Sequence, residues 1–171
     1  AGVAINLAAG TVTGGSGTDS LTSIENGSGS QFNDSLTGDD NANRLDAQLG
    51  NDTLLGAGGN DNLSGGLGDD SLDGGAGFDY AQYNDATAGV IVNLSAGTAS
   101  GGAGNDVLAA IEYVYGSSYG DTLTGDANAN VLDGQAGHDL ISGGGGQDTL
   151  IGGDGNDTLY GGTEADTLIG G

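Results

Sequence analysis

The stretch GGLGDDSLDGGAGFD (residues 65–79) contains the pattern Gly-Gly-x-Gly-x-Asp twice, and the second copy begins nine residues after the first. Further full matches begin at Gly14, Gly101, Gly143 and Gly152. In the best-preserved units an aliphatic residue stands two positions after the aspartate. A short period sustained along the chain predicts stacked structural units, each stabilised by its neighbours.

Two arrays keep the nine-residue register, at 34–81 and 121–168, and they belong to a larger duplication. A constant shift of 87 residues superimposes the second half of the chain on the first without a gap. We therefore expect a single elongated domain made of two tandem copies, 1–87 and 88–171. We also expect this sequence to be a segment of a longer protein.

The segment GVIVNLSAGTA (89–99) contains no acidic residue and lies between the two arrays. Val90 and Val92 stand at alternate positions, as the inward-facing residues of a strand do. Asp79 and Asp106, on either side of the segment, are separated by three whole periods. We therefore predict that the segment forms acid-free turns of one continuous coil.

The chain of 171 residues carries 24 acidic residues against one basic residue, Arg44, which gives a formal net charge of −23. This charge excludes binding to nucleic acid or to an anionic membrane surface, and it favours a cation as partner. Cysteine is absent, so disulfides and thiolate metal sites are excluded. No apolar run has transmembrane length, and we expect no membrane insertion by this segment.

Each nine-residue unit divides into a short strand and a turn. Three residues such as Ser71, Leu72 and Asp73 suit a strand, and only the central one points inward because side chains alternate along a strand. Two strands and two turns then close a coil of 18 residues, and coils stack at about 4.8 Å. The sequence thus predicts an all-β fold with a narrow aliphatic core.

The turns supply the chemistry of a calcium site. Glycine permits a positive φ and close backbone approach, which directs carbonyl oxygens into the gap between stacked turns, and the aspartate adds a carboxylate. A flexible set of oxygen ligands favours Ca²⁺, whereas Mg²⁺ requires a tight octahedron that keeps its waters. Zinc requires His or Cys, and the chain has one His.

The units resemble the nonapeptide G-G-x-G-x-D-x-U-x of the RTX (repeats-in-toxin) family. This resemblance implies a right-handed parallel β-roll in which each Ca²⁺ is shared by turns 18 residues apart. The earlier turn would give the carbonyls of its second and fourth positions plus its Asp, and the later turn those of its first and third plus its Asp. The implied ligand groups are Gln48, Gly50 and Asp52 with Gly65, Leu67 and Asp70; Ala57, Gly59 and Asp61 with Gly74, Ala76 and Asp79; Gln135, Gly137 and Asp139 with Gly152, Asp154 and Asp157; and Gly144, Gly146 and Asp148 with Gly161, Thr163 and Asp166.

Other turns depart from the pattern. Asp34 and Asp121 are included as candidate ligands, although their turns lack most of the glycines. Asp19 and Asp106 end perfect turns, but no acid follows 18 residues later, so we expect them to bind calcium weakly or not at all.

The acid itself is missing at two positions. Asn43 and Asn130 stand where the register requires aspartate. Sites that include them would depend on the amide oxygen or on the nearby carboxylates of Asp39 and Asp126.

The sequence contains no arrangement typical of catalysis, because cysteine is absent, histidine occurs once and no serine lies in a nucleophile elbow. His138 fills a variable turn position, which favours an exposed side chain. The aromatic residues of 111–119 fit local packing or capping better than a sugar-stacking surface. The residues flanking the inward aliphatics are irregular, which argues against an ice- or sugar-binding face.

We therefore predict a structural module, not an enzyme, that folds when it binds Ca²⁺ outside the cell. The family resemblance implies secretion by bacteria, commonly through type I export, as part of a larger protein. One alternative is a surface-layer or filament-forming protein that self-associates end to end, because a β-roll has open edges.

Overall fold

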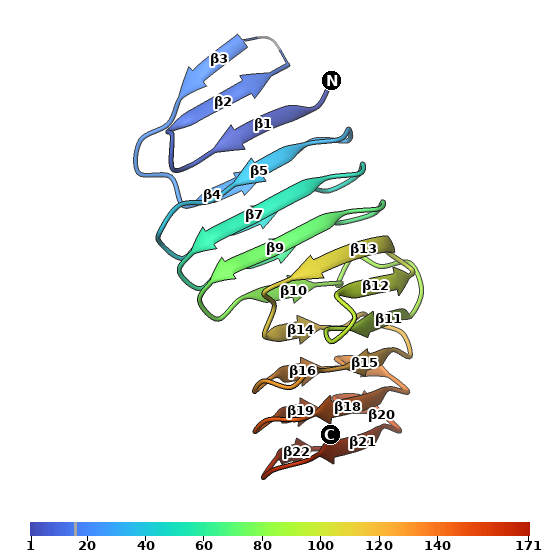
Figure 1. Ribbon diagram of the computed structural model, residues 1–171. Coiled ribbons are helices and arrows are strands. Elements are labelled where there is room, and N and C mark those ends of the chain that lie inside the picture. The colour runs from blue at the N-terminus through green and yellow to red at the C-terminus, as the bar shows by residue number, and fades with distance from the viewer. Residues whose placement is uncertain (16) are drawn as a thin grey trace.

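The computed structural model describes residues 1–15 and 17–171, and within these every regular element is a β-strand (Figure 1). Ser16, the variable position of the turn 14–19, lies outside the described residues. The predicted all-β fold is confirmed: coils of about 18 residues stack into a parallel β-solenoid of about 8 turns.

The strands form a long sheet and a short sheet on opposite sides of the core. The long sheet contains, in spatial order, β21 (Thr158–Gly162), β18 (Leu140–Gly144), β15 (Thr122–Thr124), β11 (Val90–Asn93), β12 (Thr98–Gly101), β13 (Gly104–Ala109), β9 (Ser71–Ala76), β7 (Thr53–Gly58), β5 (Ser35–Thr37), β1 (Val3–Asn6), β2 (Thr11–Gly14) and β3 (Gly17–Ser20). The short sheet contains β22 (Thr167–Ile169), β19 (Thr149–Ile151), β16 (Val131–Asp133), β14 (Tyr113–Tyr115), β10 (Tyr80–Gln82), β8 (Asn62–Ser64), β6 (Arg44–Asp46) and β4 (Asn26–Ser28). A further pair, β17 (Ala136–Gly137) and β20 (Asp154–Gly155), joins two turns.

The core is a double column of aliphatic side chains, one column from each sheet. In the long sheet Leu36 lies beside Leu54, and Leu54 beside Leu72, in parallel register. Leu45 and Leu63 are paired in the same way in the short sheet. All five are almost fully buried. Burial of a leucine side chain contributes about 1.5–3 kcal/mol, and here each leucine is covered by the coils above and below it.

The predicted continuation of the coil through residues 89–99 is wrong. β11 pairs antiparallel with β12, and β12 pairs antiparallel with β13, so this part of the chain is a three-stranded meander. The first reversal is closed locally: the Ala96 N–H donates to Asn93 Oδ1 at 2.9 Å, and the Gly97 N–H donates to the Leu94 carbonyl at 3.0 Å. Gly97 has a φ of 67°, which favours glycine. The first copy contains the same meander as β1, β2 and β3.

The meander changes how the two copies meet. β13 pairs in parallel with β9 of the first copy, and β11 pairs in parallel with β15 further along the stack. The long sheet therefore has three strands between β9 and β15, whereas the short sheet has only β14 between β10 and β16. The long sheet is thus longer here by two strand spacings, or about 10 Å. The junction between the copies, formed by the pairs β9–β13 and β10–β14, lies at this step in the stack (Figure 1).

Aromatic side chains reinforce the junction on the short sheet. The rings of Tyr80 and Tyr113, from different copies, stack with centroids 4.8 Å apart, and Tyr113 stacks on Tyr115 at 4.4 Å. These ring faces are covered by one another, as expected for local packing. The described residues contain no helix long and apolar enough to cross a bilayer.

Candidate metal centre

Two columns of acidic and amide side chains follow the edges of the solenoid, and we call them the first and second ladders. Each member immediately precedes the inward-facing part of a strand. The first ladder, beside the long sheet, contains Asp34, Asp52, Asp70, Asp106, Asp121, Asp139 and Asp157. The second, beside the short sheet, contains Asn43, Asp61, Asp79, Glu112, Asn130, Asp148 and Asp166.

One carboxylate oxygen of most ladder aspartates accepts a backbone N–H from the adjacent coil. Oδ1 of Asp52 accepts the backbone N–H of Asp34 at 2.7 Å, and Oδ1 of Asp70 accepts that of Asp52 at 2.8 Å. The same bond, spanning 18 residues, recurs between Asp61 and Asp79 at 2.8 Å. The ladder aspartates therefore fix the register of the coils even before any cation is considered.

The second oxygen of these aspartates lacks a partner. Among the described residues, six such Oδ2 atoms are buried without a hydrogen bond, those of Asp52, Asp61, Asp70, Asp79, Asp139 and Asp148. A buried acceptor left unsatisfied costs about 1–3 kcal/mol, and more when it is charged. These oxygens recur at one position of the turn, where a bound cation would compensate their buried charge.

Burial changes the acidity of these groups. Desolvation, with further repulsion from neighbouring acids, raises the pKa of Asp70 to about 7. The same causes raise the pKa of Asp61 and of Asp139 to about 6. The ionised carboxylates are thus unfavourable in the folded chain unless a proton or a cation compensates them.

Backbone carbonyls of each turn lie against the glycines of the facing turn. A Cβ added at Gly66 would collide with the carbonyl of Gln48, and one added at Gly68 with the carbonyl of Gly50. Gly68 also has a φ of 142°, which few side chains tolerate. The Gln48 oxygen accepts the Leu67 N–H at 2.8 Å, and a carbonyl oxygen has a second lone pair for a cation.

The structure brings together the four pairs of turns expected from the sequence. These are 47–52 with 65–70, 56–61 with 74–79, 134–139 with 152–157, and 143–148 with 161–166. No three carboxylate or imidazole side chains converge in the part of the chain that the structure describes. A cation between two turns would therefore be held by two aspartates and by carbonyl oxygens, a donor set that suits Ca²⁺.

Asp34 and Asp121 differ from the other aspartates because their own turns satisfy them. Asp34 Oδ2 accepts the Ser30 N–H, and its Oδ1 accepts the Ser30 hydroxyl at 3.0 Å. Asp121 accepts the N–H and the hydroxyl of Ser117 at 2.6 and 2.8 Å. We call such turns closed, because the second residue of the turn donates hydrogen bonds to the carboxylate that ends the same turn.

The turns that end in asparagine are closed in the same manner. The Asp39 N–H donates to Asn43 Oδ1 at 2.7 Å, and the Asp126 N–H donates to Asn130 Oδ1 at 2.8 Å. The Asp126 carboxylate accepts hydrogen bonds from the Asn128 backbone N–H at 2.7 Å and from the Asn128 side-chain amide at 2.8 Å. We call the turns of the four pairs above open, and in each of them the second residue has a positive φ. None of the second residues of the closed turns does.

Sequence reasoning missed the partner of Asp106. Asp106 Oδ1 accepts the Asp70 N–H at 3.0 Å, and the Gly68 N–H donates to the Ala103 carbonyl at 2.8 Å. The turn 101–106 thus stacks on 65–70 although Asp70 and Asp106 are 36 residues apart. A search for turns 18 residues apart does not find this pair, because the meander lies between them. The sequence signal for a binding turn at 101–106 was its complete Gly-Gly-x-Gly-x-Asp pattern.

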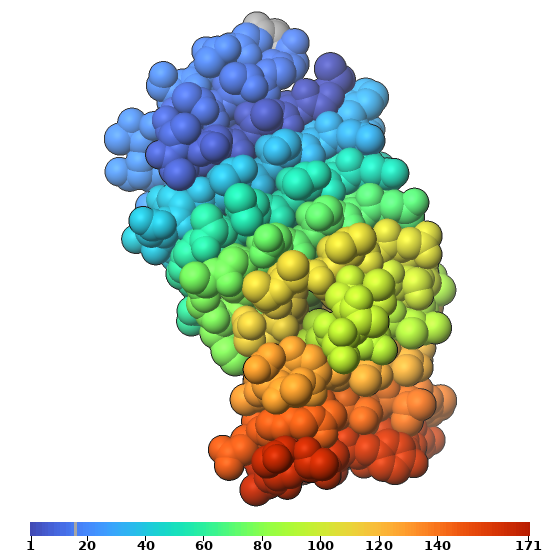
Figure 2. All heavy atoms as spheres, in the orientation of Figure 1, coloured from blue at the N-terminus to red at the C-terminus, as the bar shows by residue number. Residues whose placement is uncertain are grey.

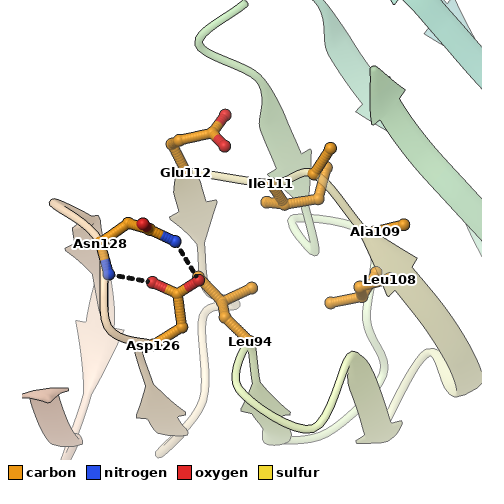
Figure 3. Close-up of a pocket in the computed structure, with 8 residues that line it drawn as sticks. Leu94, Leu108, Ala109, Ile111, Glu112, Asp126 and Asn128 are labelled. Carbon is orange, nitrogen blue, oxygen red and sulfur yellow. Dashed lines mark hydrogen bonds between the residues drawn. The ribbon is translucent and has the colours of Figure 1, made fainter. Parts of the chain in front are cut away.

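Glu112 is the second residue that the register did not identify. Its Oε2 accepts the Asp79 N–H at 2.9 Å and so takes the place of an aspartate in the second ladder. Burial, and to a smaller extent the charges of Asp79 and Asp126, raise the pKa of Glu112. Figure 3 shows Glu112 and Asp126 at a pocket of about 210 Å³, beside Leu94 and Ile111.

Comparison with known proteins agrees with this geometry. A family model for the RTX calcium-binding nonapeptide repeat (4 copies) matches residues 24–54, 46–81, 96–110, 115–150 and 151–171, which together cover well over half of the chain. No curated protein matches the sequence. The repeated turns, the ladders and the family match lead to one assignment: the chain belongs to the RTX calcium-binding nonapeptide repeat family.

Proposed function

We propose that this chain is a structural module whose folding depends on Ca²⁺. The observation that carries the proposal is the set of buried carboxylate oxygens without hydrogen-bond donors. For three of them, those of Asp61, Asp139 and Asp148, the carbonyl of the first residue of the facing turn lies close by. With a net charge of −23, the calcium-free chain is opposed in folding by repulsion between its carboxylates. Bound calcium would supply the compensating positive charge, so that its binding free energy contributes to folding.

The residues that would hold the ions follow from the open turns. In the first copy, Asp52 with Asp70 and Asp61 with Asp79 would supply the carboxylates. In the second copy, Asp139 with Asp157 and Asp148 with Asp166 would do so. The carbonyls of the second and fourth residues of the earlier turn support this choice, because they point at the facing turn in each of the pairs where the structure gives the contact.

We add a fifth pair, Asp70 with Asp106, which joins the two copies. It is supported by the direct contact between the turns 65–70 and 101–106, since a Cβ at Gly104 would collide with the Gly68 carbonyl. This is the same relationship that Gly68 has with Gly50 one coil earlier.

We further propose that the module works outside the cell, attached to a larger secreted protein. Extracellular modules bind calcium at about 10⁻⁴–10⁻³ M, far above the level of a resting cytosol. The chain would thus stay unfolded during export and fold after it. We infer a structural role, without catalysis, from the distribution of the carboxylates in repeated ladders.

A titration followed by far-UV circular dichroism tests this proposal. We expect a transition from coil to β-structure with Ca²⁺, and none with Mg²⁺ at equal ionic strength. A variant in which Asp52, Asp61, Asp139 and Asp148 are changed to Asn should need much more Ca²⁺ to fold. A matched variant with the same charge removed at exposed acids, such as Asp40 and Asp85, should not. A chain that is fully β-structured in chelator would overturn the proposal.

A further inference from the structure

The second ladder crosses the junction between the two copies at Asp79 and Glu112. The Asp79 N–H donates to Glu112 Oε2 at 2.9 Å, as the Asp61 N–H donates to Asp79 one coil earlier. Asp79 and Glu112 are 33 residues apart in the sequence, whereas the repeat spaces such partners by 18. Glu112 also lies in the segment 111–114, which the family model does not match. The nonapeptide pattern therefore assigns no function to this carboxylate.

Asp79 carries a buried acceptor without a partner. Its side chain is 0% exposed, and its Oδ1 accepts the Asp61 N–H at 2.8 Å. Its Oδ2 accepts no hydrogen bond from the described residues. The turn 74–79 that it ends is open, because the second residue, Gly75, has a φ of 94°. Asp79 thus has the same features as the aspartates that we propose as calcium ligands within each copy.

The carbonyl of Ala110 takes the position of a carbonyl in the repeat. A Cβ added at Gly56 would collide with Asp61 Oδ2 and with the carbonyl of Gly74, the first residue of the facing turn. One coil later, a Cβ added at Gly74 would collide with the Asp79 side chain and with the Ala110 carbonyl. Ala110 has a φ of 49°, which is uncommon for a residue with a side chain. A carboxylate and a carbonyl thus lie beside one point here, as they do at a repeat turn.

Glu112 brings a second carboxylate to this part of the junction. It is half-buried and lines the pocket of about 210 Å³ together with Ile111 and Asp126 (Figure 3). Neighbouring acids repel each other unless a positive charge lies between them. The chain has one Lys or Arg, which is Arg44, and it lies in β6, three strands from β14 in the short sheet. A cation from solution is therefore the partner that these carboxylates require.

We propose that Asp79 and Glu112 hold a divalent cation at the junction, with the carbonyl of Ala110 as a third ligand. Two carboxylates and a carbonyl are oxygen donors, and such a set favours Ca²⁺. The identity of the ion rests on the function proposed above. The site itself is an addition to that function, because its second half, residues 110–112, is not a nonapeptide turn.

This ion would keep more water than an ion between two repeat turns. Ala110 and Glu112 are two residues apart, whereas the first residue and the aspartate of a repeat turn are five apart. The segment 110–112 thus has fewer carbonyls to offer. Ca²⁺ takes six to eight oxygen ligands, and the pocket beside Glu112 has space for water to supply those that are missing. We therefore expect this site to bind more weakly than the sites within each copy.

Calcium would then hold the two copies together at both edges of the junction. Asp79 immediately precedes β10 and Glu112 immediately precedes β14, the two strands that pair across the junction in the short sheet. The pair Asp70 and Asp106 has the corresponding place beside the long sheet. In Figure 2 the meander, coloured yellow-green to yellow, lies between the green coils of the first copy and the orange coils of the second.

Equilibrium dialysis of residues 1–171 against Ca²⁺ tests the proposal. Glu112→Gln removes the charge but leaves an amide oxygen to accept the Asp79 N–H, so the strands should keep their register. At saturating Ca²⁺ we expect this variant to bind one ion fewer than the unchanged chain. The matched control is Glu25→Gln, the same change at the equivalent position of the first copy, where the side chain is exposed. An equal number of bound ions in both variants would overturn the proposal.

Luminescence of bound Eu³⁺ measures the predicted water directly. Eu³⁺ replaces Ca²⁺ in oxygen sites, and its emission lifetimes in H₂O and D₂O report how many waters each bound ion keeps. We expect one class of ions with more waters than the rest in the unchanged chain and in Glu25→Gln, and its absence in Glu112→Gln. A single class with few waters in the unchanged chain would overturn the proposal, even if Glu112→Gln failed to fold.

Circular dichroism of the same samples separates this proposal from the proposed function. A chain that folds with Ca²⁺ but loses no ion on Glu112→Gln substitution would overturn the junction site alone. A chain that is fully β-structured in chelator would overturn the proposed function.

Discussion

The backbone N–H of Asp70 donates a hydrogen bond of 3.0 Å to Oδ1 of Asp106, 36 residues later, whereas the same bond from Asp52 to Asp70 spans 18 residues. The first ladder thus continues through the junction although the meander interrupts the sequence repeat. The two copies are linked by the same interaction that links the coils within a copy.

The first prediction concerns this link. Asp106→Asn should weaken the coupling between the copies, so that calcium-induced folding separates into two transitions or loses steepness. The loss should be about 1–3 kcal/mol, because a charged hydrogen-bond acceptor is replaced within a buried contact. Circular dichroism titration would measure it, with the exposed Asp40→Asn as the charge-matched control. An unchanged steepness would show that Asp106 does not couple the copies.

The second prediction concerns pH in the absence of calcium. The pKa is raised by burial to about 7 at Asp70 and to about 6 at Asp61, above the value of 3.8 expected for an unfolded chain. Protonation therefore favours the folded state, and the free energy of unfolding should rise as the pH falls from about 8 to about 5. Far-UV circular dichroism in calcium-free buffer would measure this as a gain of β-structure when the pH is lowered from about 8 to about 5. In saturating Ca²⁺ acidification should have the opposite effect, because protons compete with the cation. A calcium-free chain that gains no β-structure on acidification would contradict the prediction.

The third prediction separates the core from the surface with two adjacent leucines. Leu54 is 1% exposed and Leu55 is 38% exposed. Leu54→Ala should lower the free energy of unfolding of the calcium-loaded chain by about 2–5 kcal/mol, because it leaves a cavity in the column. Leu55→Ala should cost far less. Chemical denaturation in saturating calcium would compare them, and equal losses would argue against the narrow core.

The fourth prediction concerns the close approach of the turns. Gly68→Ala should separate the facing turns, since the added Cβ would collide with the Gly50 carbonyl and φ is 142°. We expect weaker calcium binding and a loss of stability of more than about 1 kcal/mol. Gly170→Ala is the control, because a Cβ there would meet nothing within 4 Å. Isothermal titration calorimetry of both variants would decide the matter.

The fifth prediction concerns the closed turns. Asn43→Asp alone should add no calcium site, because the Asp39 N–H would still donate a hydrogen bond to the side chain at position 43. Adding Asp39→Gly allows the second residue of the turn a positive φ and should create a site with Asp61. Calorimetry should find one more bound ion in the double variant than in Asp39→Gly alone. Extra binding by the single variant would show that closure of the turn does not control the site.

The sequence by itself determined everything that depends on local periodicity. The nine-residue register identified the inward leucines such as Leu63, the coil of 18 residues and the paired turns that contain Asp52 and Asp70, because strand alternation and turn chemistry act over a few residues. It also indicated calcium through the kind and density of the oxygen donors.

The tertiary structure decided what depends on contacts between distant segments. The meander at β11–β13 exists because two chain reversals pair strands that the repeat would have stacked as coils. Those reversals bring Asp106 onto Asp70 and Glu112 onto Asp79, at separations that no period of the sequence marks. Whether a ladder carboxylate accepts a hydrogen bond from its own turn likewise depends on the backbone conformation of the second residue of that turn. Only the folded chain fixes this conformation.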